Sequence, residues 1–416
     1  MGAVLRWIGL GVGVAAAVTL LVVAPAGVPP SSLSDGEASG TSTVSVPATT
    51  ATTARTTPPT TTVRQTTTSL AVDFPMEGPI FGEKTGVLLL FDDGYDGLTA
   101  FDADRRLVAR STVEGQRPGD EPYSMIRVGD SLVVGWGPPH AVSIATRDAT
   151  SLGEATMFLP AAEPGRVWLI DYGNRIGDHT PRVWQVDIAS GETVSDPVEM
   201  AGGYPLIGIP GGLALQTDTG LDLWYADTGQ TVTLVADGPG FALDGFGDHL
   251  VWCSGYCTEL RVADTSTLAT EFYPAPSGHD RFLSGRFSPS GRHLAVLVGG
   301  LDVYEGEALW LLDRETGDIT VIGDPDSHVE FVAWSPDGGQ VFATSSGSRI
   351  TVVWRYNLAN QVLTAVVLPF WRTFRPVVVD ASVAGAYFDE VLVDPSECRA
   401  PGSFPSRRSG ICTFGL

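Results

Sequence analysis

The chain has 416 residues, of which 43% are hydrophobic and 18% are charged, and its formal net charge is −23. Lys84 is the only lysine, so the sequence lacks the basic stripe on which nucleic-acid binding depends, and an acidic surface also repels anionic lipid head groups. With 49 glycines and 29 prolines, the composition favours an all-β protein of short strands and tight turns.

Residues 1–30 predict a signal peptide or a signal-anchor helix. An apolar and small-residue run from Trp7 to Val23 follows Arg6, and the small residues up to Ala26 suit a signal-peptidase site. Cleavage after Ala26 and retention as an anchor are both open. In either case the positive end stays inside, so we expect the rest of the chain to be exported, either secreted or anchored to the cell membrane and facing outward.

Residues 31–72 predict a disordered Thr/Pro-rich stalk. Half of the residues from Thr41 to Thr68 are threonine, and large apolar side chains are almost absent. Such a segment cannot bury enough apolar surface to fold alone, and Thr/Pro tracts in exported proteins favour extended stalks.

A short pattern, an apolar residue followed four positions later by Asp or Asn, returns seven times after the stalk. The copies are Leu98–Asp102, Ile144–Asp148, Val183–Asp187, Leu223–Asp227, Leu260–Asp264, Leu309–Asp313 and Val353–Asn357. Their last residues are 37 to 49 positions apart, which is the period of four-stranded propeller blades. We therefore expect a seven-bladed β-propeller over residues 73–380.

Two turns carry a recognisable sequence, Phe287-Ser288-Pro289-Ser290-Gly291 and Trp334-Ser335-Pro336-Asp337-Gly338. At these residues the chain resembles the TolB-like, WD-repeat-like propeller repeats of bacterial exported proteins. The resemblance covers roughly residues 85–370 and implies the fold. The separate N-terminal domain of TolB is missing, so the resemblance does not extend to the TolB partner.

A propeller must close its ring, and the first repeat has no innermost strand of its own. An extra strand at Phe374–Asp380 follows the seventh repeat, and we expect it to pair into the first blade. The alternative is a loose C-terminal extension. The recurring Trp184, Trp224, Trp310 and Trp354 occupy one position of the repeat, which predicts packing between blades.

Four cysteines predict two local disulfides, Cys253 with Cys257 and Cys398 with Cys412, as suits an exported protein. The first would pin a hairpin loop. The second would close a loop in a C-terminal extension, residues 381–416. A Cys₄ zinc site would lack the usual ligand spacing.

The links between the second and third strands of the blades share one face of a propeller, and they predict a ligand-binding face. Five of these links carry an aromatic residue, and several carry acidic residues. The candidate binding residues are Tyr95, Trp136, Asp171, Tyr172, Arg175, His179, Tyr256, Asp302 and Tyr304. Aromatic rings and clustered carboxylates suit a basic peptide, a sugar or Ca²⁺. The alternative interpretation is that the aromatic residues cap strand ends and the acids keep the loops soluble.

Motifs for a serine hydrolase elbow, a zinc metalloprotease, a phosphate-binding loop and an EF-hand are absent from the sequence. We therefore expect a monomeric, non-catalytic binding or scaffolding propeller, without a cofactor other than Ca²⁺, whose ligand is an envelope protein, a peptide or a glycan. The alternative is a propeller hydrolase or lyase with a channel Ca²⁺ or acidic site, since propeller enzymes assemble their sites from several blades.

Overall fold

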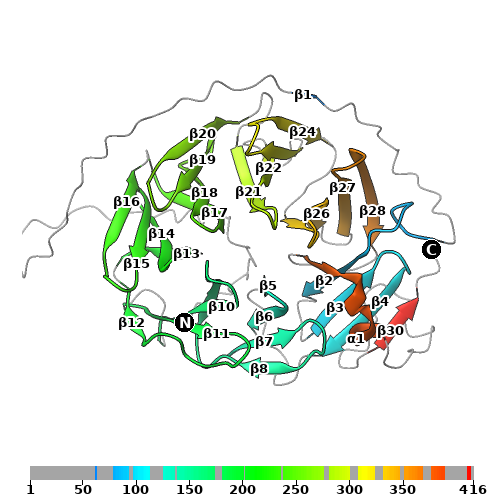
Figure 1. Cartoon of the computed structure of the whole chain (residues 1–416), viewed down its shortest axis with the longest axis horizontal. Coiled ribbons are helices and arrows are strands. Elements are labelled where there is room, and N and C mark those ends of the chain that lie inside the picture. Colours follow the sequence, from blue (N-terminus) through cyan, green and yellow to red (C-terminus); the bar gives the residue numbers. More distant parts are fainter. Residues whose placement is uncertain are drawn as a thin grey trace, which may run out of the picture.

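A computed structural model describes residues 61–62, 78–92, 97–112, 125–135, 138–173, 180–200, 202–235, 238–275, 281–299, 308–323, 331–346, 351–368, 376–388 and 410–413. The fold is an all-β, seven-bladed propeller in which seven antiparallel sheets stand around a common axis (Figure 1). The innermost strands contact one another in the order β29, β5, β9, β13, β17, β21 and β25, and β25 contacts β29 again. The predicted fold class is confirmed. Residues 1–30, 63–72 and most of 31–62 lie outside the described part, as does the helix or linker expected there.

Blades 1 to 4 are given from the axis outward. Blade 1 consists of β29 (Val377–Asp380), β2 (Val87–Asp92), β3 (Gly97–Asp102), β4 (Leu107–Thr112) and β30 (Gly410–Thr413). Blade 2 consists of β5 (Met125–Val128), β6 (Ser131–Gly135), β7 (Pro139–Ser143) and β8 (Ala149–Ser151). Blade 3 consists of β9 (Met157–Pro160), β10 (Arg166–Asp171), β11 (Arg182–Asp187) and β12 (Val198–Glu199). Blade 4 consists of β13 (Tyr204–Ile209), β14 (Gly212–Thr217), β15 (Gly220–Tyr225) and β16 (Thr231–Val235).

The remaining blades follow the same order. Blade 5 consists of β17 (Gly240–Phe246), β18 (His249–Ser254), β19 (Glu259–Asp264) and β20 (Thr270–Pro274). Blade 6 consists of β21 (Arg281–Phe287), β22 (His293–Gly299), β23 (Ala308–Asp313) and β24 (Ile319–Gly323), and β1 (Thr61–Thr62) pairs with β24 in parallel. Blade 7 consists of β25 (Phe331–Trp334), β26 (Gln340–Ser346), β27 (Thr351–Asn357) and β28 (Val362–Leu368). A 3-10 turn η1 (Ala381–Ala384) and a short helix α1 (Gly385–Phe388) follow β29.

The core is divided among the blade interfaces, each of which holds its own apolar cluster. The second strands are apolar on both sides because neighbouring blades bury both of their faces. In β10, Val167 and Leu169 pack toward blade 2, whereas Trp168 and Ile170 pack toward blade 4. The sequences of the second strands are therefore continuous apolar runs, without alternation of apolar and polar residues.

The recurring tryptophans pack between blades, as predicted. Trp224, Trp310 and Trp354 are each 1–2% exposed and belong to clusters that combine residues of two blades. Trp184 is partly buried and packs against the cluster between blades 2 and 3. These side chains therefore belong to the core and leave the faces of the ring to other residues.

Four of the recurring aspartates, Asp102, Asp187, Asp264 and Asp313, cap the turns between the third and fourth strands, whereas Asp227 lies beyond the end of β15. One Oδ1 atom accepts backbone N–H groups two and three residues further on, as in Asp187 (3.1 and 3.0 Å) and Asp264 (2.9 and 2.8 Å). An aspartate that bonds its own backbone in this way favours a turn. The hydroxyl of Ser266 and these N–H groups lower the pKa of Asp264 to about 2. The period of the aspartates therefore marks the turns of the blades and not a catalytic or binding site.

The second copy of the pattern, Ile144–Asp148, was assigned wrongly. The third strand of blade 2 ends at Ser143, and Ile144–Asp148 forms the turn that follows it. Ser143 Oγ accepts the N–H of Thr146 at 3.2 Å, so a serine hydroxyl takes the place that an aspartate carboxylate takes in other blades. The aspartate pattern therefore places the end of this strand five positions too late.

The ring closes as predicted, because the extra C-terminal strand pairs into the first blade. β29 pairs antiparallel with β2, with Val87 opposite Asp380 and Leu90 opposite Val377. The first blade therefore combines the two ends of the propeller, and a loose extension at this strand is excluded. Cys398 lies outside the described residues, so the predicted pair Cys398–Cys412 stays a prediction. No helix in the described ranges has the length and apolar character needed to span a bilayer.

Candidate functional site

Each blade runs antiparallel, so its links alternate between the two faces of the ring. We call "loop face" the one that carries the links between second and third strands and the links between blades. We call "turn face" the opposite one. The predicted binding residues belong to the loop face. Of these, Asp171, Tyr172 and Tyr256 are described, whereas the others lie outside the described residues, namely Tyr95, Trp136, Arg175, His179, Asp302 and Tyr304.

Asp171 ends β10 and is tied to its own blade. Its Oδ2 accepts a hydrogen bond from the guanidinium of Arg182 at 3.3 Å, and its Oδ1 accepts the N–H of Gly173 at 2.8 Å. Arg182 lies directly opposite Asp171 in the strand pair β10–β11. The pair holds the start of the longest link between a second and a third strand, and both side chains remain partly open to solvent.

Tyr172 is buried, with 8% of its surface exposed, and packs in the cluster between blades 3 and 4. Burial raises the pKa of its phenol well above the ordinary value, and the neighbouring Tyr204 adds to this. Among the described residues, its hydroxyl has no hydrogen-bond partner. The ring thus packs inward instead of offering an open platform, while one polar atom near the loop face is left without a partner.

Tyr204 is a residue of the loop face that the sequence did not single out. It is the first residue of β13 and lies 45% exposed. Partial burial raises the pKa of its phenol. An aromatic residue at the loop-face end of an innermost strand stands beside the channel of a propeller. This position of Tyr204 is a weak sequence signal for a binding residue. Together Tyr172 and Tyr204 place one buried and one open phenol at the boundary of blades 3 and 4.

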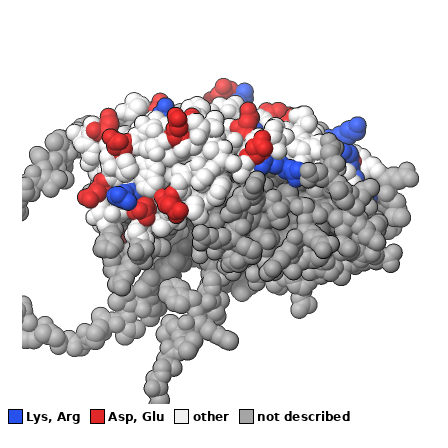
Figure 2. Space-filling view, turned by 90° about the horizontal axis from the view of Figure 1, so that it is seen from below, with Lys and Arg blue, Asp and Glu red and all other residues white. Residues whose placement is uncertain are grey.

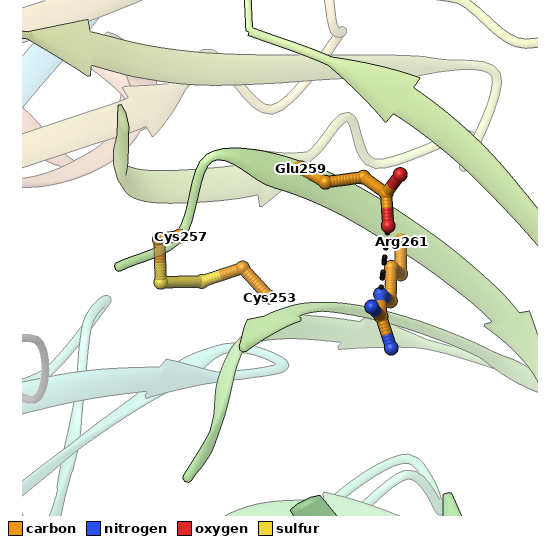
Figure 3. Close-up of a disulfide and its surroundings, with 4 residues drawn as sticks. All are labelled: Cys253, Cys257, Glu259 and Arg261. Carbon is orange, nitrogen blue, oxygen red and sulfur yellow. Dashed lines mark hydrogen bonds and ion pairs between the residues drawn. A yellow bond between two sulfur atoms is a disulfide. The ribbon is translucent and has the colours of Figure 1, made fainter. Parts of the chain in front are cut away.

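Tyr256 is the most open large apolar side chain among the described residues, with 81% of its surface exposed. It stands between Gly255 and Cys257, which both have positive φ angles (56° and 55°). The predicted disulfide from Cys253 to Cys257 is confirmed, with Cα atoms 4.9 Å apart (Figure 3). A five-residue covalent loop therefore fixes the backbone on both sides of this exposed ring.

Two backbone hydrogen bonds attach the disulfide loop to its surroundings, and a third attaches Thr258, the residue that follows it. Gly255 N–H donates to Pro239 O at 3.0 Å, Phe282 N–H donates to Cys257 O at 2.8 Å, and Ala275 N–H donates to Thr258 O at 3.1 Å. The loop is thus connected to the links on both sides of blade 5. It is an element of the rigid ring, although Tyr256 itself points into solvent.

The strand after the loop is stiffened by Arg261. Its guanidinium lies over the ring of Trp252 at 4.8 Å and over the ring of Phe272 at 5.5 Å. Its Nε donates to Glu259 at 3.1 Å, a contact that Figure 3 shows. These contacts hold the guanidinium of Arg261 within blade 5, on the strand that follows the loop.

Within the described ranges, His, Cys, Asp and Glu side chains form no group of three or more that could hold a metal ion. Most links of the loop face lie outside these ranges, so a Ca²⁺ site on this face, which the sequence leaves open without predicting it, is not tested by the described residues. The described arrangement offers aromatic contact area, a carboxylate and an unpartnered phenol, which are binding features.

Among known proteins, similarity to this chain is found in solved structures. No family model matches the chain, and no curated protein sequence matches it. Similar solved structures include apo AztD from Citrobacter koseri (13% identity, 70% of this chain, 89% of that chain, TM-score 0.44) and TolB from Acinetobacter baumannii (10%, 69%, 81%, 0.41). Another is the dihydro-heme d1 dehydrogenase NirN (14%, 72%, 76%, 0.48). Similarity to TolB and other seven-bladed propellers was predicted and is found at the level of the fold; it does not extend to ligand, partner or activity.

Proposed function

We propose that this chain is a non-catalytic binding propeller, exported and displayed outside the cytoplasmic membrane, which presents the loop face of blades 3 to 5 to a protein, peptide or glycan. The observation that carries the proposal is the placement of Tyr256, an 81% exposed aromatic ring on a loop closed by a disulfide. Exposure of a large aromatic side chain is otherwise unfavourable, and such rings are enriched among the residues that dominate binding energy.

The disulfide loop supports this function because it lowers the entropic cost of binding. A flexible loop loses freedom when it meets a ligand, and each ordered side chain costs about 0.5–1.5 kcal/mol. The covalent bridge and two backbone hydrogen bonds have already ordered the loop around Tyr256. Tyrosine itself adds contact area with only two side-chain torsions to order and a polar tip that can bond a ligand.

A second exposed tyrosine on the same face enlarges the surface. Tyr204 belongs to blade 4, next to the blade of Tyr256, and is 45% exposed. Asp171 in blade 3 adds a carboxylate that is partly open to solvent. A surface with separated tyrosines and a carboxylate suits a peptide or glycan that lies across several blades.

The proposal is tested with the full chain on peptide and glycan arrays. We expect ligands that bind the wild-type chain to be lost, or weakened about tenfold, when Tyr204 and Tyr256 are both changed to alanine, as for hot-spot residues. The matched control changes Val194 and Val362 to alanine, which are 42% and 48% exposed outside the loop face. If both double variants bind every array ligand like the wild type, the loop face is not the binding surface.

A further inference from the structure

The outer edge of blade 7 is formed by β28, which pairs with β27 on its inner side (Figure 1). Among the described residues, no strand lies on its other side. β28 runs over seven residues, Val362–Leu368. An open edge of this length presents a row of backbone N–H and C=O groups that can pair with another strand.

The other blades protect their outer edges in ways that blade 7 lacks. β4 of blade 1 is covered by β30, and β24 of blade 6 is covered by β1. β8 and β12 have only three and two residues, and β20 carries Glu271 and Pro274. Short strands, charges, prolines and added cover are the usual means of keeping such edges apart. Of the described outermost strands, only β16 also has an uncovered edge without charge or proline at comparable length, and it has five residues.

Blade 7 is also the part of the chain where acidic residues are missing. None of the 48 aspartates and glutamates lies between Asp337 and Asp380, which is the longest acid-free stretch of the sequence. Elsewhere acidic side chains are spread over the described surface, as on the side that Figure 2 shows, with fewer basic ones among them. Glu83 contacts the end of β27, but its charge is paired with Arg355 at 2.9 Å.

The net charge favours a second copy of this chain as the occupant of the edge. Two copies with a net charge of −23 repel each other over most of their surface. This repulsion is weakest at the outer hairpin of blade 7, because β27 and β28 carry no acidic residue. The sequence of β28, VLTAVVL, has no charge at all, so two such strands place no like charges opposite each other.

The side chains of β28 leave its edge open. Leu363 and Ala365 pack against the apolar cluster between blades 6 and 7, and Val366 belongs to the cluster between blades 7 and 1. Val362, at the turn-face end of the strand, is 48% exposed. A paired strand would remove part of this apolar surface from water, which favours association.

We propose that β28 is a dimerisation strand: two copies of this chain pair antiparallel along the outer edges of their seventh blades, so that two four-stranded sheets become one. A two-fold axis relates the two strands, as in most dimers of identical chains. Because antiparallel pairing reverses the strand direction, the loop faces of the two copies point to opposite sides. The dimer departs from the monomer expected from the sequence, and it does not depend on the binding function proposed above.

The test is sedimentation equilibrium of the full chain in a density-matched detergent, which keeps the apolar run from Trp7 to Val23 in solution. We expect a concentration-dependent equilibrium between monomer and dimer. Val362→Lys with Thr364→Lys should weaken the dimer about tenfold or more, because both edge strands then bring like charges to neighbouring positions of the pair.

The matched control is Val194→Lys with Thr231→Lys, which introduces the same charges at exposed positions of blades 3 and 4. It should dimerise like the wild type. Thermal unfolding of both double variants should match the wild-type monomer, which shows that the ring is intact. A dimer that survives the lysines on β28 would be held by another part of the chain, and the proposal would be wrong.

Hydrogen exchange of the wild-type chain gives a readout that needs no variant. The backbone amides of β28 should exchange more slowly at a concentration where the dimer dominates than at one where the monomer dominates, whereas those of β16 should not change. A wild type that stays monomeric up to its solubility limit, or β28 amides whose exchange does not depend on concentration, would overturn the proposal.

Discussion

Arg355 in blade 7 donates a hydrogen bond to the carboxylate of Glu83 at 2.9 Å, although 272 residues separate them in the sequence. The Arg355 side chain is 3% exposed, and its Nε also donates to Gln340 Oε1 at 2.5 Å. Gln340 in turn donates to the carbonyl of Thr85 at 2.8 Å. The segment before the first strand is thus bound to the last blade by side chains, beside the pairing of β29 with β2.

Glu83→Gln should make the stability of the ring less dependent on acidic pH. The hydrogen bond from Arg355 holds the pKa of Glu83 below its usual range in the folded state. A carboxyl with a lowered folded pKa stabilises the protein above its unfolded pKa, and this contribution is lost as the pH falls through the folded pKa. The wild-type chain should therefore unfold at a higher temperature than Glu83→Gln at about pH 6, and the gap should shrink toward about pH 3.

The control for this measurement is Glu154→Gln, which removes the same charge at an exposed position. Its melting temperature should follow the wild type across the same pH range. A gap between wild type and Glu83→Gln that stays constant with pH would show that ionised Glu83 does not stabilise the seam.

Removal of β29 should open the ring. Val377, Val378 and Val379 are 8%, 3% and 1% exposed, and burial of each such side chain contributes about 1.5–3 kcal/mol. Deletion of residues 374–416 also leaves one edge of β2 unpaired. We expect loss of a single cooperative transition in thermal unfolding followed by circular dichroism.

A chain that ends after Phe388 is the matched control, because it keeps β29, η1 and α1. It should melt cooperatively and close to the wild type. If deletion of 374–416 melted like this control, β29 would not be needed for closure.

The sequence was sufficient for the fold because the repeat is set by local chemistry. Aspartates such as Asp187 and Asp264 recur where the chain must turn, and apolar runs such as Leu88–Phe91 recur where both faces of a strand are buried. In blade 2 the pattern predicts the wrong strand end, because Ser143 caps the turn with a hydroxyl in place of a carboxylate. A physical role can thus be conserved along the chain while the residue that fills it changes.

The candidate site was harder to predict because exposure is decided by the neighbouring blade. Tyr172 and Tyr256 both follow a second strand, yet one is 8% exposed and the other 81%. Tyr172 belongs to an apolar cluster that includes Leu213 and Leu215 of the next blade, whereas Tyr256 lies on the exposed disulfide loop and belongs to no such cluster among the described residues. The repeat pattern does not show which side chains of the neighbouring blade a given residue will contact.

Changing Cys253 and Cys257 to serine should lower the free energy of unfolding by about 2 kcal/mol, the value expected for closing a five-residue loop. Chemical denaturation of the variant and the wild type, both without reductant, measures this. Reduced wild-type protein should match the variant. The double variant should also lose the array ligands of Tyr256, because the loop would then be ordered only on binding. An unchanged stability, or retention of these ligands at full affinity, would contradict the role given to the bridge.

Tyr172→Phe should leave the free energy of unfolding unchanged or raise it by up to about 1 kcal/mol, because the variant removes a buried hydroxyl that has no partner within the described part of the chain. Tyr273→Phe is the matched comparison. Tyr273 is similarly buried, at 4% exposed, but its hydroxyl donates to Glu271 at 2.5 Å, so its loss should cost about 1 kcal/mol. Urea denaturation of the two variants and the wild type checks the order. If Tyr172→Phe cost as much stability as Tyr273→Phe, the Tyr172 hydroxyl would be hydrogen-bonded in solution. If Tyr172→Phe lowered the affinity for a ligand, the phenol would belong to the binding surface.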